Sequence, residues 1–452
     1  MSWQTRRSEV RRLVSLAWPV MLAHFQWLAL NLIDTAMVGR FSTTELAYLG
    51  AGRILHWTGI VVCMGLISGV TVLTARADGA GDHHRCGAIL RQGIAYAIAI
   101  GGLALSILYL SGATILRLID VPADMVAGGA GFMRILALAY VPNLVAIACH
   151  YFLEGISRPR PVMVISLSTL PLNAGLNWLF IYGNAGLPAM GADGAALGTL
   201  LSVVVGAIAV VAYIWTMPDR RRYGIGASWR GAWRDGVELR RFGLVPGLAS
   251  AFELGGFSIV MAIGAALGAV PAAAFQAVIS LHMASMVFMA GLASAAAVRV
   301  GNAIGAGEAS AVARRGWLAA GMAAASILAI AACYLAMPRV VLAPFTADPA
   351  LLVLAVDMLV LLAPFLVFDG AQAVLLYALR AAGDQVVAGV IQTFAFFVVM
   401  CGIAFALVHH TDVGALALPL SLGLGALVAF VLMAARFLMV ARHPPALRKR
   451  RA

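Results

Sequence analysis

The chain has 452 residues, of which 62% are hydrophobic and only 11% are charged. A soluble domain carries roughly 25% charged residues, so this composition excludes a water-soluble fold, a disordered chain and a small disulfide scaffold. The net charge of +12 does not indicate a nucleic-acid partner, because the cytoplasmic loops of membrane proteins are themselves rich in arginine. We therefore predict an integral membrane protein that binds no nucleic acid.

Twelve apolar segments follow one another along the chain, and a membrane-spanning helix needs roughly 20 such residues. In chain order, we predict spans at 13–38, 46–75, 89–111, 128–153, 161–182, 191–216, 238–263, 272–300, 311–337, 350–379, 385–408 and 412–440. The longest hydrophilic break, Pro218 to Arg241, contains seven arginines and separates the first six spans from the last six. These breaks predict an N-lobe at 1–217 with spans one to six, a basic cytoplasmic linker at 218–237, a C-lobe at 238–440 with spans seven to twelve, and a basic cytoplasmic tail at 441–452.

The basic residues alternate between the two sides of these spans. Of the 31 Lys and Arg, 26 fall on the side that holds the N-terminus, the linker and the tail. The other five lie at the opposite ends of spans and are Arg40, Arg53, Arg117, Arg134 and Arg339. Because Lys and Arg collect in cytoplasmic loops, this pattern predicts a multi-pass protein with both termini in the cytoplasm.

The two halves of the chain repeat each other. Pro19 and Pro142 in the first half match Pro246 and Pro364 in the second, and the glycine-rich turn at 79–82 matches the one at 305–308. Six spans per half make these parallel repeats, an arrangement known from transporters. We predict an all-α polytopic membrane protein with twelve transmembrane helices in two pseudo-symmetric six-helix bundles around a central cavity, with matched kinks at the prolines.

Most acidic residues lie in loops or near the ends of predicted spans, and three lie deeper inside them. Glu253 follows Arg241 by twelve residues, or about 18 Å of helix, and Asp369 precedes Arg380 by eleven, which puts both acids near mid-membrane. Asp34 lies nearer the outer end of the first span. Two desolvated carboxylates favour a shared proton or a bound Na⁺, so Glu253 and Asp369 are a candidate cation site. The alternative is that each is capped by neighbouring donors and positions a helix.

Asn173 and Asn177 are candidate partners of Asp34. They are four residues apart on one helix face, so their amides can donate to the carboxylate, with Thr199 on the next span as another polar neighbour. The alternative is ordinary hydrogen bonding between helices.

Aromatic and histidine residues in the spans carry weaker signals. The aromatic candidates for lining an adaptable apolar cavity are Phe252, Phe257 and Phe288. We interpret four isolated histidines without metal-ligand spacing as polar packing residues: His24, His56, His150 and His282.

These stretches resemble the multidrug and toxic compound extrusion (MATE) family, and within it the NorM-type bacterial branch. The resemblance covers essentially the whole length and is carried by Trp18-Pro19, Leu32 to Gly39, Pro171 to Trp178, Ala251-Phe252-Glu253, Gln276, Arg299-Val300-Gly301 and Phe368-Asp369. It implies an antiporter of the bacterial inner membrane that exports amphipathic organic cations in exchange for inward Na⁺ or H⁺, and it implies no other cofactor.

The resemblance also implies roles for the candidate residues. Asp34 matches the family's N-lobe acid, and Asn173, Asn177 and Thr199 match its polar partners. Glu253 and Asp369 match the C-lobe acids of the NorM-type branch, where Na⁺ is a possible ligand. The chain departs from some relatives because Phe368 and its neighbours offer no tyrosine beside Asp369, so the coupling ion stays open between Na⁺ and H⁺.

Two other functions compete with a drug exporter. A lipid-linked oligosaccharide flippase of the same superfamily commonly has additional helices or a strongly basic cavity, whereas the arginines here lie almost wholly in loops. An intramembrane enzyme needs a metal cluster or an activated nucleophile, and neither H-E-x-x-H nor G-x-S-x-G occurs in the sequence. We therefore predict a monomeric transporter in the lipid bilayer that is not an enzyme.

Overall fold

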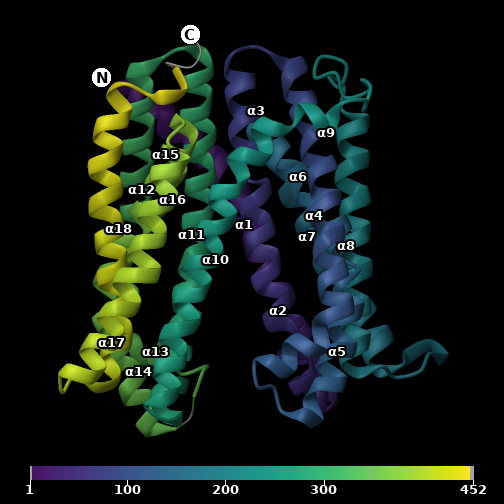
Figure 1. The fold of residues 1–452 in the computed structure, drawn as a ribbon, viewed down its shortest axis with the longest axis vertical. Helices are drawn as coiled ribbons and strands as arrows, with labels where there is room; N and C mark the ends of the chain where they lie inside the picture. The colour runs from purple at the N-terminus through teal and green to yellow at the C-terminus, as the bar shows by residue number, and fades with distance from the viewer. Residues whose placement is uncertain (1–2, 347, 448–452) are drawn as a thin grey trace. The chain divides into compact units, whose positions relative to one another are not determined.

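A computed structural model describes residues 3–346 and 348–447. The basic residues 448–451 of the predicted tail lie outside this range. The described residues form helices and turns without a strand (Figure 1). The first half comprises α1 (Trp3–Phe41), α2 (Thr43–Ile67), α3 (Gly69–Gly79), α4 (His83–Leu118), α5 (Ala123–Ala137), α6 (Tyr140–Gly155), α7 (Arg160–Tyr182), η1 (Asn184–Gly186) and α8 (Gly191–Thr216).

The linker contains the short α9 (Ala232–Asp235), and the second half follows it. Its elements are α10 (Val237–Ala266), α11 (Ala269–Ala306), α12 (Ala309–Ala336), α13 (Pro338–Leu342), α14 (Pro349–Leu362), η2 (Ala363–Phe365), α15 (Leu366–Ala382), α16 (Gln385–Thr393), η3 (Phe394–Val399), α17 (Met400–His410), η4 (Gly414–Leu416) and α18 (Ala417–Arg442).

Eleven helical segments among the described residues are long and apolar enough to cross a membrane. A twelfth span arises from α5 and α6, which pass the same test together but are bent by 46° at the break between them. Each of the twelve predicted spans overlaps one of these segments, so the prediction of an all-helical polytopic protein is confirmed.

Prolines mark equivalent breaks in the two halves. Pro142 lies in the first turn of α6, directly after the bend, and Pro364 lies in the 3₁₀ turn η2 between α14 and α15. Proline has no backbone N–H and its ring clashes with the preceding turn, so each span is interrupted at that point. Pro19 and Pro246 remain inside continuous helices, α1 and α10.

The chain divides into two compact units. The N-terminal unit consists of residues 22–78 and 82–247, and the C-terminal unit consists of the residues up to Met21, 79–81, and those from Leu248 on. Each has its own hydrophobic core, around Tyr140 and Phe152 in the N-terminal unit and around Phe275 and Phe396 in the C-terminal unit. The units differ from the predicted lobes because α1 and α10 each change unit two residues or fewer after their proline.

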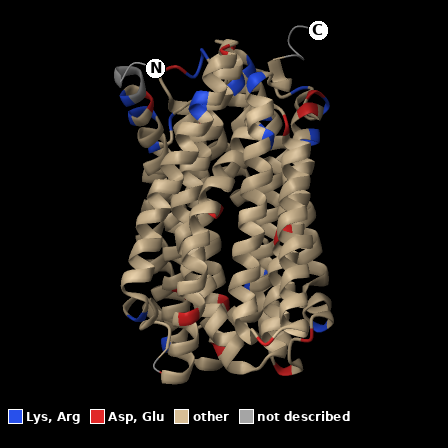
Figure 2. Ribbon diagram, turned by 90° about the vertical axis from the view of Figure 1, so that its left-hand side faces the viewer, with Lys and Arg blue, Asp and Glu red and all other residues tan. Residues whose placement is uncertain are grey.

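Buried ion pairs explain why the start of α1 belongs to the C-terminal unit. Glu9 accepts two hydrogen bonds from the Nη2 of Arg299 on α11, at 2.8 and 2.9 Å. Arg315 on α12 lies 3.4 Å from the same carboxylate and 3.2 Å from Glu308. Most other Lys and Arg lie at helix ends, whereas a few acidic residues lie partway along helices (Figure 2). Those mid-helix acids are the unusual charges of this molecule.

Candidate functional site

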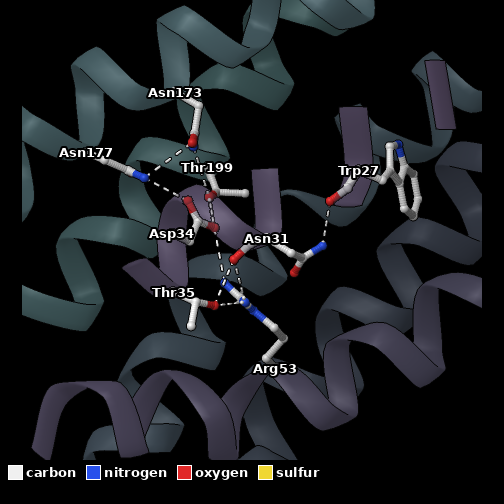
Figure 3. A network of polar contacts seen from close by, with 8 residues as sticks. All are labelled: Trp27, Asn31, Asp34, Thr35, Arg53, Asn173, Asn177 and Thr199. Carbon is white, nitrogen blue, oxygen red and sulfur yellow. Dashed lines mark hydrogen bonds and ion pairs between the residues drawn. The ribbon is translucent and has the colours of Figure 1, made fainter. Parts of the chain in front are cut away.

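Asp34 on α1 is the buried acid of the N-terminal unit, with 3% of its surface exposed. Its Oδ1 accepts a hydrogen bond of 2.7 Å from the amide of Asn177, and its Oδ2 accepts one of 3.2 Å from the hydroxyl of Thr199 (Figure 3). A buried charge is stable only when it is paired and hydrogen-bonded. These donors meet part of that requirement.

Asn173 completes the polar network around Asp34. It donates to Thr199 at 3.3 Å and accepts from Asn177 at 3.2 Å. The two asparagines share one face of α7, which packs along α8 and so faces Thr199. The structure therefore brings together all four residues that the sequence assigned to this lobe, and their role in transport stays a prediction.

Arg53 is a member of this network that the sequence analysis missed. Its Nη2 donates to Asp34 Oδ2 at 3.2 Å, and its Nη1 donates to the hydroxyl of Thr35 at 3.0 Å and to the carbonyl of Asn31 at 3.3 Å (Figure 3). The sequence groups Arg53 with the arginines at the opposite ends of spans, yet in the structure it lies ten residues into α2. That position was the available signal, because an arginine so far inside an apolar segment needs a partner. We call these five residues, Asp34, Arg53, Asn173, Asn177 and Thr199, the Asp34 site.

A cavity of about 100 Å³ opens beside the Asp34 site. Asp34 and Arg53 both line it, together with Trp27 and Trp57. These two indole rings form an edge-to-face pair with centroids 5.9 Å apart. The cavity therefore combines an aromatic wall with one negative and one positive side chain.

Glu253 on α10 is one of two acids in the C-terminal unit. Its Oε2 accepts a hydrogen bond of 2.6 Å from Gln392 at the end of α16, next to the π-helical turn η3. The same glutamine accepts one of 2.9 Å from Arg380 on α15. Gln392 thus stands between the arginine and the carboxylate. Single π-helical turns within α-helices are frequent at functional sites.

Asp369 is the second acid of this unit, and 2% of its surface is exposed. Because Pro364 restarts the helix, Asp369 lies in the first turn of α15. Its Oδ1 accepts a hydrogen bond of 3.0 Å from the amide of Gln372, and its Oδ2 lies 3.7 Å from Nε2 of His282 on α11. Glu253 lies one turn before Phe257 on α10, and the ring centroid of Phe257 lies 6.2 Å from that of His282, so the two acids face the same region of the unit. We call Glu253, His282, Asp369, Gln372 and Gln392 the Asp369 site.

His282 is not isolated in the fold, because its ring lies against Asp369; whether it does more than pack stays a prediction. Its side chain is 1% exposed, and neither ring nitrogen has a hydrogen-bond partner among the described residues. Such buried orphan nitrogens are rare in folded proteins. Asp369 is 87 residues away in the chain, so sequence spacing offered no signal for this pair.

The predicted cavity aromatics take different positions. Phe257 lies beside His282, with ring centroids 6.2 Å apart. Phe252 and Phe288 are 44% and 47% exposed. The N-terminal cavity is lined instead by Trp27, Trp57 and Phe132, so a cavity role for the three predicted phenylalanines stays a prediction.

One further cluster, near the end of α3 and the start of α4, consists of Asp78, His83 and Cys86. Its potential ligand atoms lie within 4.8 Å of one another. However, Arg222 contacts Nε2 of His83, and since arginine only donates, that nitrogen must accept. The ring proton is then on Nδ1, which faces Asp78 at 3.6 Å. That contact is longer than a hydrogen bond, and Nδ1 has no hydrogen-bond partner among the described residues. With Arg222 on Nε2 and the ring proton on Nδ1, neither nitrogen of His83 offers a free lone pair to a metal ion.

Known proteins show the same construction. The sequence model of the MatE family matches the chain twice, at residues 19–179 and 247–406, which agrees with the internal repeat. A probable multidrug resistance protein NorM of Caulobacter vibrioides is 31% identical over 442 residues, which cover 96% of this chain and 91% of that protein. The multidrug resistance protein PmpM of Pseudomonas aeruginosa is 28% identical over 86% of this chain and 82% of its own length.

Solved structures share the fold. The crystal structure of the eukaryotic MATE transporter AtDTX14 superimposes with a TM-score of 0.89 at 20% identity, covering 98% of this chain and 99% of that one. The outward-facing conformation of a multidrug resistance MATE family transporter gives 0.88 at 20% identity over 97% of both chains. With two matches that together span most of its length, this multi-pass membrane protein belongs to the MatE family of transporters.

Proposed function

We propose that this chain is a multidrug exporter of a bacterial inner membrane that moves amphipathic organic cations outward in exchange for inward H⁺. Its named relatives support drug export, since NorM and PmpM are described as multidrug resistance proteins. Export against a gradient needs an ion-binding group that changes its charge within the membrane. The Asp369 site supports that role, and the protein acts as a monomer without another cofactor.

The observation that carries this proposal is the buried contact between Asp369 and His282. Both side chains are almost fully inaccessible, and Asp369 Oδ2 and both nitrogens of His282 have no hydrogen-bond partner among the described residues. Neither acid of the site directly contacts a Lys or Arg in the described ion pairs. An ion that binds here supplies a partner for these three buried atoms.

The neighbours of the two acids favour a proton over Na⁺. Gln372 and Gln392 present amide N–H groups to the carboxylates, and His282 presents a ring nitrogen. Hard cations such as Na⁺ prefer several oxygen ligands, whereas a carboxyl and an imidazole can share a proton. Na⁺ is the second candidate, because the buried Oε1 of Gln372 also lacks a partner.

Ethidium efflux from proteoliposomes tests this proposal. We expect efflux when an inward H⁺ gradient is imposed at equal Na⁺, and its loss when a protonophore collapses that gradient. Liposomes that carry the double variant Glu253→Gln/Asp369→Asn set the background. Efflux driven by Na⁺ alone, at equal pH and with the protonophore present, would make Na⁺ the coupling ion. Efflux under neither gradient would refute an ethidium antiporter.

The orientation of the chain is a separate part of the proposal, and it is supported by the 26 of 31 basic residues on one side. In a variant without its five native cysteines, a cysteine at Ser228 in the linker should resist an impermeant maleimide in intact cells. A cysteine at Asp412, between α17 and α18, should react. The reverse pattern would place the termini outside the cell.

A further inference from the structure

Arg53 gives the Asp34 site a positive charge of its own. The guanidinium contacts three groups of α1, namely the carboxylate of Asp34, the hydroxyl of Thr35 and the carbonyl of Asn31. Asp34 in turn accepts from Arg53, Asn177 and Thr199. The carboxylate is therefore already paired and hydrogen-bonded as an anion, without a bound cation.

This pairing changes what the cavity can bind. Asp34 and Arg53 are its charged lining residues, so together they leave the wall without net charge. A ligand cation gains the carboxylate only if it displaces the guanidinium. A ligand anion gains the guanidinium in competition with Asp34, and a planar guanidinium matches a carboxylate with two parallel hydrogen bonds.

The cavity wall fits an aromatic ring beside that charge. Trp27 and Trp57 form an edge-to-face pair on the lining, with centroids 5.9 Å apart. Aromatic rings favour such offset or edge contacts. The cavity volume of about 100 Å³ is of the same order as the roughly 150 Å³ cavity that holds one benzene molecule in another protein, so at most about one small ring of a ligand is enclosed by it.

We propose that Arg53 makes the N-terminal cavity a binding site for aromatic ligands that carry a carboxylate, and that Asp34 holds the guanidinium in place when no such ligand is bound. The proposal adds a substrate class to the exporter described above and, as far as transport is concerned, rests on that function. Binding itself depends on Arg53 and the two tryptophans, with Asp34 as the competing carboxylate. Figure 3 shows Arg53, Asp34 and Trp27.

Three ligands that share one ring separate the effect of charge from that of shape: benzoate, benzamide and benzylammonium. Binding is measured by calorimetry on the full chain in nanodiscs, with empty nanodiscs as the blank and without any ion gradient. In the wild type, benzoate should bind more tightly than benzamide. Asp34→Asn should strengthen benzoate binding about tenfold, since it removes the competing carboxylate while keeping the shape of the side chain.

Variants of Arg53 test the same idea from the other side. Arg53→Gln should weaken benzoate binding about tenfold, to the level of benzamide, and should make benzylammonium the preferred ligand. Arg53→Lys should keep a smaller preference for benzoate, because it retains the charge but loses the planar fork. Arg134→Gln, at an exposed arginine of the same unit, is the matched control and should behave as the wild type.

Two results would overturn the proposal. One is an unchanged benzoate preference in Arg53→Gln, and the other is no gain in benzoate affinity in Asp34→Asn. Thermal unfolding of each variant shows whether it is folded, and Arg53→Lys keeps the test informative if Arg53→Gln is not. If gradient-driven ethidium efflux is absent but the expected order of affinities for the three ligands is found, only the exporter proposal fails. The two proposals can therefore fail separately.

Discussion

The two units differ in the partners that they provide for their buried acids. In the N-terminal unit, Asp34 accepts three hydrogen bonds, one of them from an arginine at 3.2 Å. In the C-terminal unit, Asp369 has one amide donor and a histidine at 3.7 Å, and Gln392 separates Glu253 from Arg380. One buried carboxylate is thus paired with an arginine, whereas neither of the other two contacts a Lys or Arg in the described ion pairs.

This difference teaches that repeated halves need not carry repeated chemistry. Both halves match the same family model and break equivalent spans at Pro142 and Pro364. The positions aligned with Glu253 and Asp369 in the first half are roughly Gln26 and Ile147, neither of which is an acid. The two halves repeat the arrangement of helices, whereas a few side chains determine which half carries the buried acids.

The largest effect on export is expected from replacing Glu253 or Asp369, the two acids without a direct Lys or Arg partner in the described ion pairs. Glu253→Gln and Asp369→Asn should each reduce gradient-driven export to the level of empty liposomes, because an amide cannot release or take up the coupling proton. Asp412→Asn, in an exposed loop of the same unit, is the control. Export that persists in both variants, measured in proteoliposomes, would remove the Asp369 site from the coupling mechanism.

The next effect concerns stability in the N-terminal unit. Arg53→Met should lower the free energy of unfolding by about 3 kcal/mol, since it leaves the Asp34 carboxylate buried without its counter-charge. The double variant Arg53→Met/Asp34→Asn should regain most of that loss. Denaturant titration in detergent measures both. Equal losses in the single and double variants would show that Arg53 acts through packing rather than through charge.

A smaller effect on rate is expected from His282. His282→Asn keeps a polar side chain at this depth but removes the ring that faces Asp369, so H⁺-driven export should fall by about tenfold, within the range typical of a positioned proton-transfer group. His410→Asn, at the exposed end of α17, is the matched control. An unchanged rate at every imposed pH difference would return His282 to a packing role.

The smallest effect, a loss of stability, is expected from replacing Asp219, which lies outside the membrane spans. Hydrogen bonds from Arg158 lower the pKa of Asp219 below its usual value of 3.8, and the pair is partly exposed. A lowered pKa contributes stability that is present above pH 3.8 and is lost as the pH falls through the lowered value. Asp219→Asn should therefore cost below about 1 kcal/mol at neutral pH. A cost that is equally large at pH 2 would exclude the ion pair as its source.

Much of the fold was predictable because it depends on hydropathy and residue order, which can be read along the chain. Hydropathy located the twelve spans, the order of prolines and glycines located the repeat, and distance from the arginine clusters placed Glu253 and Asp369 deep in their spans. The grouping of Asp34 with Asn173, Asn177 and Thr199 also emerged before the structure, since residues four apart share a helix face.

The partners of the acids were decided only by tertiary packing. Arg53 reaches Asp34 from α2, and His282 reaches Asp369 from α11; neither pair has a spacing that marks it in the sequence. Hydropathy is a local property that each residue adds to its own segment, whereas a salt bridge depends on how two helices are rotated and shifted against each other. The sequence therefore determined where the charges lie in depth, and the packed helices determined which charge each one meets.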